Sequence, residues 1–312
     1  MKKIKVFIDG KEGTTGLRIF ERLACRDDIE LMTLSEEMRK DAGARKQALN
    51  SCDIAFLCLP DAAAQEAVSM IENPEVKVID ASTAHRTLPG WAYGFPELSP
   101  AHFEKIKSSK RVAVPGCHAS GFIALVYPLT ASGLLPADSL LTCHSITGYS
   151  GGGKKMIAQY EGAAREAFLN SPRQYGLTQQ HKHLKEMKAI TGIENEPIFC
   201  PIVADFYSGM AVTVPLFASQ LSGRKGIEDI INVYKNTYDT DFVKYTEDTG
   251  ADAMFCAQSM SGRDGMEILV KGNSERILLL ARYDNLGKGA SGAAVECMNI
   301  LMGADPKTGL NL

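Results

Sequence analysis

The chain has 312 residues, of which 45% are hydrophobic and 23% are charged, and its formal net charge is −3. This length and composition predict a globular protein of two domains, and the slight negative charge excludes a broad basic surface for nucleic acid. No apolar run approaches the length of a membrane span, which excludes a membrane-spanning helix.

The state of the eight cysteines depends on the cellular compartment of the protein. The N-terminal run predicts a first β-strand over Ile4 to Ile8, and we expect no export signal there. We therefore expect reduced thiols in a cytoplasmic protein rather than a disulfide framework. The cysteines form no Cys-x-x-Cys pair and no cluster with zinc-ligand spacing, so we expect no metal.

A glycine-rich turn follows this first strand and leads into an amphipathic helix. Its glycines are Gly10, Gly13 and Gly16, spaced G-x-x-G-x-x-G rather than in the usual dinucleotide pattern, with Thr14 and Thr15 between them. Glycines let the backbone approach a pyrophosphate, and the helix start supplies N–H donors. The turn therefore predicts nucleotide binding, although a plain strand-to-helix turn would share the spacing.

Strand-like and helix-like segments then alternate. The strand-like segments are 29–34, 54–59 and 76–79, and the helix-like segments are 36–50 and 62–71, the latter capped by Asp61. This β-α-β-α order predicts a doubly wound parallel sheet, a Rossmann-like fold in the α/β class. Ligands of such sheets bind at the carboxyl ends of the strands.

The end of the second strand bears on the choice of cofactor. NAD-binding folds commonly place an acidic residue there for the ribose 2′-hydroxyl. This chain has Ser35, followed by Arg39 and Lys40, which suits a 2′-phosphate and therefore NADP. A solvated charged helix is the alternative reading, because Glu36 and Glu37 lie beside the two cations.

Cys117 is the strongest candidate for a nucleophile. A strand-like segment, 112–114, is followed by Pro115-Gly116, then the cysteine, then an apolar helix-like run. At a helix start the unpaired N–H groups and the positive dipole end favour a thiolate and could hold an oxyanion. Most free cysteines are small buried hydrophobes, so the argument rests on this strand-turn-helix setting.

Two motifs follow in the middle of the chain. Residues 147–155 contain three consecutive glycines and two lysines, and could form a flexible turn or a loop that cradles an anion. His181 and His183 are candidates for acid–base work at neutral pH, although surface histidines are the usual case. Their spacing would point both rings the same way only in an extended segment.

The last part of the chain is rich in β-strand signals. Runs at 198–203 and 210–217 and a hairpin joining 268–271 to 276–283 predict an α+β domain with a mostly antiparallel sheet. The small residues from Asp284 onward lead into an apolar helix over 293–301. They permit close backbone approach, either to a cofactor or to another helix.

Six ordered motifs together resemble a known family. They follow the glycine-rich turn and are Asp80-Ala-Ser-Thr-Ala-His-Arg86, Tyr93-Gly-Phe-Pro-Glu97, Pro115-Gly-Cys117, Gly148-Tyr-Ser-Gly, His181-Lys-His183 and Asp284-Asn-Leu-Gly-Lys-Gly-Ala. Over essentially its whole length the chain resembles the N-acetyl-γ-glutamyl-phosphate reductases of arginine biosynthesis, in their shorter second type. That family belongs to a wider class with aspartate-semialdehyde dehydrogenase.

The resemblance implies a domain organisation. An NADP-binding Rossmann domain over 1–116 would be completed by the C-terminal segment 286–312, and 117–285 would be the catalytic and dimerisation domain. It also implies a homodimer or homotetramer.

The resemblance implies roles for individual residues as well. Cys117 would attack an acyl phosphate and form a thioester that NADPH reduces, with His181, or else His183, moving the protons. Arg86 and Ser150 would bind the substrate. The remaining expected sites hold NADP(H): Gly10, Gly13, Thr14, Thr15, Gly16, Ser35, Arg39, Asn285 and Lys288.

The residues alone leave three alternatives open. A dehydrogenase acting on aspartyl phosphate would share the cysteine and NADP. A thiol hydrolase using Cys117 and a histidine would bind no nicotinamide. A nucleotide sensor would tolerate loss of the thiol.

Overall fold

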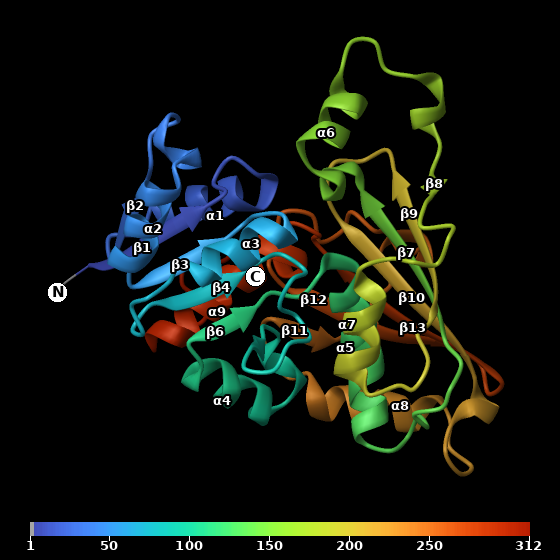
Figure 1. Cartoon of the computed structure of the whole chain (residues 1–312). Coiled ribbons are helices and arrows are strands. Elements are labelled where there is room, and N and C mark those ends of the chain that lie inside the picture. Colours follow the sequence, from blue (N-terminus) through green and yellow to red (C-terminus); the bar gives the residue numbers. More distant parts are fainter. Residues whose placement is uncertain (1–2) are drawn as a thin grey trace. The chain divides into compact units, whose positions relative to one another are not determined.

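The computed structural model describes residues 3–312, whose contacts divide the chain into two compact units (Figure 1). Unit 1 contains the chain up to Pro96 together with Pro100–Pro115 and Ala290–Leu310. Unit 2 contains Glu97–Ser99, Gly116–Gly289 and Asn311–Leu312. Among residues 3–312, no helix is both long and apolar enough to cross a membrane.

Unit 1 is built around a six-stranded sheet in the order β2-β1-β3-β4-β6-β5, with every neighbouring pair parallel. Its elements are β1 (Ile4–Asp9), α1 (Thr14–Ala24), β2 (Ile29–Met32), α2 (Ala42–Ser51), β3 (Ile54–Leu57), α3 (Asp61–Ser69), β4 (Lys77–Asp80), β5 (Ala92–Tyr93), α4 (Pro100–Ser108), β6 (Arg111–Ala113) and α9 (Gly292–Met302). The doubly wound sheet predicted from the β-α-β-α alternation is confirmed.

The strands of unit 1 distribute their side chains between two hydrophobic cores, as the two-residue period of a strand requires. Val6 and Ile8 of β1 pack with side chains of α1, α4 and α9, whereas Phe7 between them packs with α2 and α3. Helices therefore cover both faces, and the C-terminal helix α9 supplies one of these covers. The arrangement places the turn after β1 at the carboxyl edge of a rigid parallel sheet.

Two details of unit 1 differ from the sequence prediction. The predicted helix 36–50 is a short 3-10 turn at Met38–Lys40 followed by α2, because the Asp41 carboxylate accepts a hydrogen bond from the Ala44 N–H and starts a new helix. Asp61 was expected to cap α3 but lies inside its first turn. Its carboxylate accepts hydrogen bonds from the backbone N–H and the hydroxyl of Thr83 instead.

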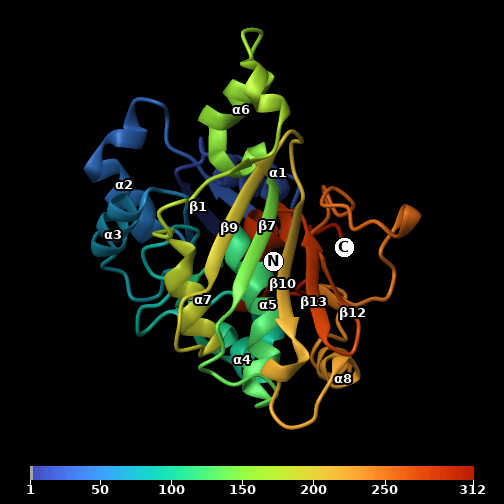
Figure 2. The ribbon, with the colours of Figure 1, turned by 90° about the vertical axis from the view of Figure 1, so that its right-hand side faces the viewer.

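Unit 2 contains a seven-stranded sheet in the order β11-β12-β13-β10-β7-β9-β8, which Figure 2 shows with its central strands side by side. Its elements are α5 (Cys117–Ala131), β7 (Thr142–Gly148), α6 (Gly153–Glu161), β8 (Arg173–Gln174), α7 (His183–Thr191), β9 (Ile198–Ala204), β10 (Met210–Phe217), α8 (Ile227–Thr237), β11 (Val243–Tyr245), β12 (Met266–Gly272) and β13 (Arg276–Tyr283). Four of the six neighbouring pairs are antiparallel, including the predicted hairpin of β12 and β13.

One face of this sheet carries helix α5. The His118 ring of α5 bonds Ser145 of β7, and Gly121 of α5 lies against Val212 of β10 and Tyr283 of β13. Since successive strand residues point to opposite faces, residues such as Ile146 and Leu278 point away from α5. The segment 147–155 is not a simple loop, because Tyr149–Gly152 forms a 3-10 turn and α6 follows directly.

Candidate active site

Cys117 is the first residue of α5, with Gly116 as the N-cap. The predicted thiol at a helix start is therefore present, and the side chain is partly exposed. A Cβ built on Gly289 would lie 3.1 Å from Cys117 Cβ, so the backbone at Gly289 packs directly against Cys117. The small residues after Asp284 thus allow close approach to the cysteine, which the sequence did not indicate.

Three other cysteines, Cys52, Cys58 and Cys143, show the ordinary behaviour of a small hydrophobe. Burial raises the pKa of the Cys52 and Cys58 thiols to about 12, and it raises that of Cys143 as well. These three thiols remain protonated at neutral pH and cannot serve as nucleophiles. Cys117 differs from them because it lies at the positive end of a helix.

Three histidines meet in unit 2 beside the nucleophile helix. The ring centroids of His181 and His183 are 4.7 Å apart, and His118 lies 6.2 Å and 5.7 Å from them. His183 begins α7 and its backbone N–H donates to His181 Nδ1, so the two rings meet around a helix start rather than along an extended segment. Among residues 3–312, no group of three or more His, Cys, Asp and Glu residues is arranged to hold a metal ion.

Both ring nitrogens of His118 have partners. Nδ1 lies 2.6 Å from Ser145 Oγ, and Nε2 lies 2.7 Å from the Tyr175 hydroxyl. Burial, and then the neighbouring His181, lower the pKa of His118 to about 3, so this ring is neutral. His118 is therefore held in place and has no ring nitrogen to spare for a substrate.

His181 is more open than His118. Burial, and then the adjacent Lys182, lower its pKa to about 4. The ring is therefore an unprotonated base at neutral pH, which suits a group that accepts a thiol proton.

The Glu186 carboxylate lies between His183 and Gly116, which is the N-cap of α5. Glu186 is buried, and its Oε2 accepts a hydrogen bond of 3.1 Å from the Gly116 N–H. Its Oε1 lies 3.9 Å from His183 Nε2. Glu186 was not predicted from the sequence, although its position three residues after His183 on a helix was the available signal.

The structure brings together Ser150 and Asn285. The Asn285 side-chain amide donates to Ser150 Oγ at 2.9 Å, and its oxygen accepts from the Gly209 N–H at 2.9 Å. Lys288 lies elsewhere in unit 2, where its ammonium is buried and contacts a Glu97 carboxylate oxygen at 2.5 Å. The Asn285 and Lys288 side chains are thus both engaged inside unit 2.

Arg86 lies in unit 1, on the loop after β4. Its guanidinium is largely buried and donates to the backbone carbonyls of Val114 and Ala81. The preceding His85 is fixed by Asp80, 2.6 Å from its Nδ1, and stacks on Trp91 at 4.1 Å. Two groups therefore brace the residue before Arg86 and hold the loop in one conformation.

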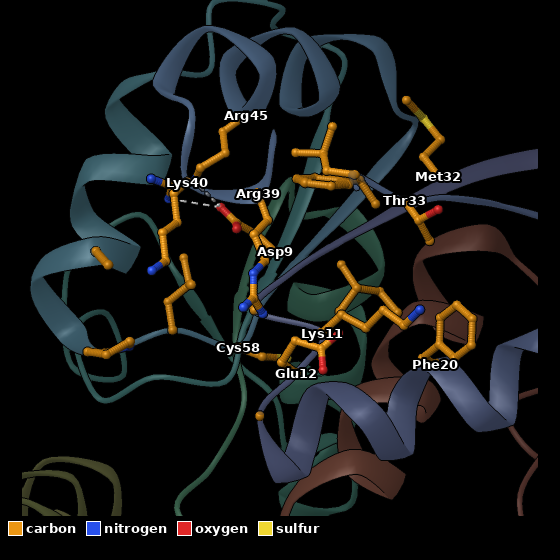
Figure 3. A pocket seen from close by; sticks show the side chains of 18 residues that line it. Asp9, Lys11, Glu12, Phe20, Met32, Thr33, Arg39, Lys40, Arg45 and Cys58 are labelled. Carbon is orange, nitrogen blue, oxygen red and sulfur yellow. Dashed lines mark hydrogen bonds and ion pairs between the residues drawn. The ribbon is translucent and has the colours of Figure 1, made fainter. Parts of the chain in front are cut away.

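A cavity of about 530 Å³ opens beside the glycine-rich turn of unit 1 (Figure 3). Gly10 and Gly13 line it, while Thr14, Thr15, Gly16 and Ser35 are not among the residues that line it. Gly10 has a φ of +86°, and a Cβ on Gly16 would lie 2.5 Å from the Gly10 carbonyl oxygen. These two positions require glycine for the turn itself.

The residues present at this turn fit a nucleotide. Thr14 Oγ1, at the start of α1, is buried and has no hydrogen-bond partner within the described chain, residues 3–312. A buried hydroxyl without a partner is costly unless a ligand engages it. A helix N-terminus with such a hydroxyl is a suitable place for a phosphate.

Basic side chains line the cavity, among them Arg39, Lys40 and Arg45 (Figure 3). Thr33 and Leu34, which follow β2, line it as well. Arg39 contacts the exposed Glu36 at 2.8 Å, and Arg45 contacts Asp9 at 2.9 Å. Ser35 accepts hydrogen bonds that shape the turn at Met38. Arg45 was not predicted from the sequence, because it comes from α2 and no motif marks it.

Two family descriptions match the two halves of the chain. Residues 5–106 match the NAD binding domain of semialdehyde dehydrogenases, and residues 117–285 match their dimerisation domain.

The fold is shared with solved structures. Aspartate semialdehyde dehydrogenase II from Vibrio cholerae superposes with a TM-score of 0.73, covering 97% of this chain and 99% of that one, at 17% sequence identity.

Closer relatives decide the family. A protein from Nostoc sp. named N-acetyl-gamma-glutamyl-phosphate reductase 2 is 45% identical, covering 99% of this chain and 100% of the relative. A Pseudomonas putida protein of the same name is 44% identical, covering 96% of this chain and 97% of the relative. The chain belongs to the N-acetyl-γ-glutamyl-phosphate reductase family. The resemblance inferred from six motifs is confirmed, and members of this family are oxidoreductases.

Proposed function

We propose that this protein reduces N-acetyl-L-glutamyl 5-phosphate to N-acetyl-L-glutamate 5-semialdehyde and phosphate, through a thioester on Cys117. The reaction consumes one NADPH and one proton, and it is a step of arginine biosynthesis. The observation that carries the proposal is the position of Cys117 at the start of α5, in a chain whose family reduces acyl phosphates.

The first half of the reaction forms the thioester. Cys117 Sγ attacks the acyl carbon, and the N–H groups at the helix start stabilise the oxyanion of the tetrahedral intermediate. The carbon–oxygen bond to phosphate then breaks, and phosphate leaves with the electron pair. Arg86 and Ser150 are the proposed substrate-binding residues, and a guanidinium fork suits a phosphate.

The second half of the reaction reduces the thioester. NADPH, when bound, supplies the hydride. His181 accepts the thiol proton before the attack, and its lowered pKa keeps it unprotonated beforehand. After reduction, His181 returns this proton to the oxyanion, which leaves a thiohemiacetal on Cys117. The hydroxyl proton of the thiohemiacetal then passes back to His181 as the carbon–sulfur bond breaks, which releases the aldehyde and the thiolate. His183, linked through Glu186 to Gly116, is the alternative proton carrier.

The cofactor is NADP(H), and the residues of unit 1 fit it. Gly10, Gly13 and the start of α1 would hold the pyrophosphate, with Thr14 and Thr15 as hydroxyl donors. The absence of an acidic side chain at Thr33 and Leu34 and the basic lining by Arg39 and Lys40 support a 2′-phosphate. Asn285 and Lys288 remain proposed cofactor contacts, although both side chains already have protein partners.

A steady-state assay tests the function. Phosphate-dependent reduction of NADP is measured with N-acetylglutamate 5-semialdehyde and with aspartate semialdehyde. We expect a large preference for the acetylated five-carbon substrate. Preference for the four-carbon substrate would instead make the protein an aspartyl-phosphate reductase.

Matched variants test the nucleophile. Cys117→Ser should lose activity by orders of magnitude and retain NADPH binding, because a serine hydroxyl ionises far less readily than a thiol. Cys25→Ser, which changes an exposed thiol, is the control and should retain full activity. Retained turnover in Cys117→Ser would refute the thioester, and failure of the unmodified protein to bind NADPH would favour a thiol hydrolase.

We also propose that the protein forms a homo-oligomer. Residues 117–285 match a dimerisation domain, and the sheet face of unit 2 that points away from α5 carries several large exposed apolar side chains among polar ones. Its outward side chains with large exposure are Ile146, Ile198, Phe217 and Leu278. A second copy covering this face would give a homodimer, or part of a homotetramer. Light scattering should show an oligomer that Ile146→Asp dissociates, and a monomeric wild-type protein would refute it.

A further inference from the structure

Tyr283 makes an unusual contact with the first turn of the nucleophile helix. Its hydroxyl donates to the Cys117 carbonyl oxygen at 2.5 Å and accepts from the Gly121 N–H at 3.0 Å. An α-helix normally joins these same two groups to each other, since residue i+4 donates to residue i. The hydroxyl of a buried tyrosine on β13 therefore engages both partners of that helical bond.

Gly121 makes this contact possible. A Cβ at this position would lie 2.7 Å from the Tyr283 hydroxyl oxygen and 2.7 Å from a Val212 methyl carbon. Any larger residue would push the hydroxyl out of the turn. The glycine and the tyrosine are thus complementary, and the Tyr283 side chain is entirely buried.

Two further tyrosines donate to the same helix, for a different reason. Tyr238 donates to the Ala124 carbonyl at 2.8 Å, and Tyr234 donates to the Leu125 carbonyl at 2.5 Å. Pro128 lies inside α5 and has no N–H, so the Ala124 carbonyl lacks its helical donor. Tyr238 therefore replaces the donor that Pro128 cannot supply. No proline occurs at the corresponding position of the Cys117 turn, so a missing donor does not account for the Tyr283 hydrogen bonds.

We propose that Tyr283 is a positioning residue for the reaction, which fixes the first turn of α5 and thereby the direction of Cys117 Sγ. The Tyr283 hydroxyl connects the Cys117 carbonyl and the Gly121 N–H to strand β13. The first turn of α5 therefore cannot tighten or unwind independently of the sheet. The N–H groups at the helix start are fixed with it. The inference rests on the proposed role of Cys117 as nucleophile.

Its test compares Tyr283→Phe with the matched control Tyr238→Phe. Both variants delete one buried hydroxyl that bonds α5, and both should lower the melting temperature similarly. Alkylation of Cys117 by iodoacetamide is followed by mass spectrometry of its peptide between pH 5 and 9, with kcat and KM measured in parallel. We expect Tyr283→Phe to lower kcat about tenfold or more with KM unchanged, since misplacement by about 1 Å costs about a hundredfold. We also expect slower alkylation, because the N–H groups that favour the thiolate are no longer held in place.

Tyr238→Phe should leave alkylation and kcat within twofold of the wild type. Equal effects of the two variants on alkylation, or none from either, would overturn the proposal. If Tyr283→Phe does not fold, Gly121→Ala replaces it, because the added methyl displaces the hydroxyl, and the same slow alkylation is expected. Alkylation requires no turnover, so it reports on Tyr283 even if Cys117→Ser shows that the nucleophile lies elsewhere.

Discussion

Replacing Lys288 by methionine removes one partner of a buried ion pair. The exposed fractions of the Lys288 and Glu97 side chains are 2% and 4%, so solvent screens the pair little. Glu97 Oε2 already lacks a hydrogen-bond partner among residues 3–312, and the substitution would leave the whole carboxylate unpaired. Breaking such a pair costs about 3–5 kcal/mol. With an unfolding entropy of about 2.1 cal/mol/K per residue, that corresponds for a chain of 312 residues to a fall in melting temperature of about 5–8 °C.

Thermal unfolding without cofactor measures the loss, and Glu97→Gln/Lys288→Met is the control. The double variant removes both charges and should recover most of the stability, because no unpaired charge remains. NADPH titration of the folded single variant tests the proposed cofactor contact separately. A Lys288→Met protein with unchanged melting temperature would refute the reasoning from burial, and a large loss of NADPH affinity alongside it would assign Lys288 to the cofactor.

Three further predictions concern the cofactor turn and the histidines. Gly16→Ala should weaken NADPH binding more than tenfold and destabilise the apoprotein by about 1–3 kcal/mol, whereas Gly13→Ala, with room for its methyl, should keep the melting temperature. Arg39→Ala should weaken NADPH binding and leave NADH binding unchanged in fluorescence titrations. Urea unfolding should show that the free energy of unfolding falls as the pH drops from about 6.5 toward 4, and His118→Gln should flatten this slope. A slope unchanged by that substitution would contradict the assignment of the pH dependence to His118.

The sign of the pH effect follows from burial. The folded chain lowers the pKa of His118 to about 3 and that of His181 to about 4. An unfolded histidine titrates near 6.5, so the unfolded chain binds protons first as the pH falls. The free energy of unfolding therefore decreases over that window and is fully retained above it.

Local signals were enough to predict much of the fold. The alternation of β-branched runs and amphipathic helices predicted the parallel sheet, and the Gly272 turn between two apolar runs predicted the β12–β13 hairpin. The boundaries near Asp41 and Asp61 were wrong because the choice between two possible caps depends on side-chain partners. Thr83, the partner of Asp61, lies 22 residues away in sequence.

The site was less accessible from the sequence. Pro115-Gly116-Cys117 marked a helix start, which is a local feature, and the structure has it. Tyr175 and Tyr283 carry no such mark, because each acts through a contact made by the folded chain. Glu186 was marked only by its spacing of three residues from His183, which is informative only once a helix is known to start there. The meeting of His181 and His183 also depended on a helix starting between them, which their spacing alone could not indicate.

The thioester on Cys117 is the central claim, and trapping it is the most direct test. The protein is mixed with N-acetylglutamate 5-semialdehyde and NADP in the absence of phosphate, so that no acyl acceptor other than water is present. We expect a burst of NADPH equimolar with the active sites and an N-acetylglutamyl group on the Cys117 peptide by mass spectrometry. A burst without an adduct, or an adduct on another residue, would contradict the account.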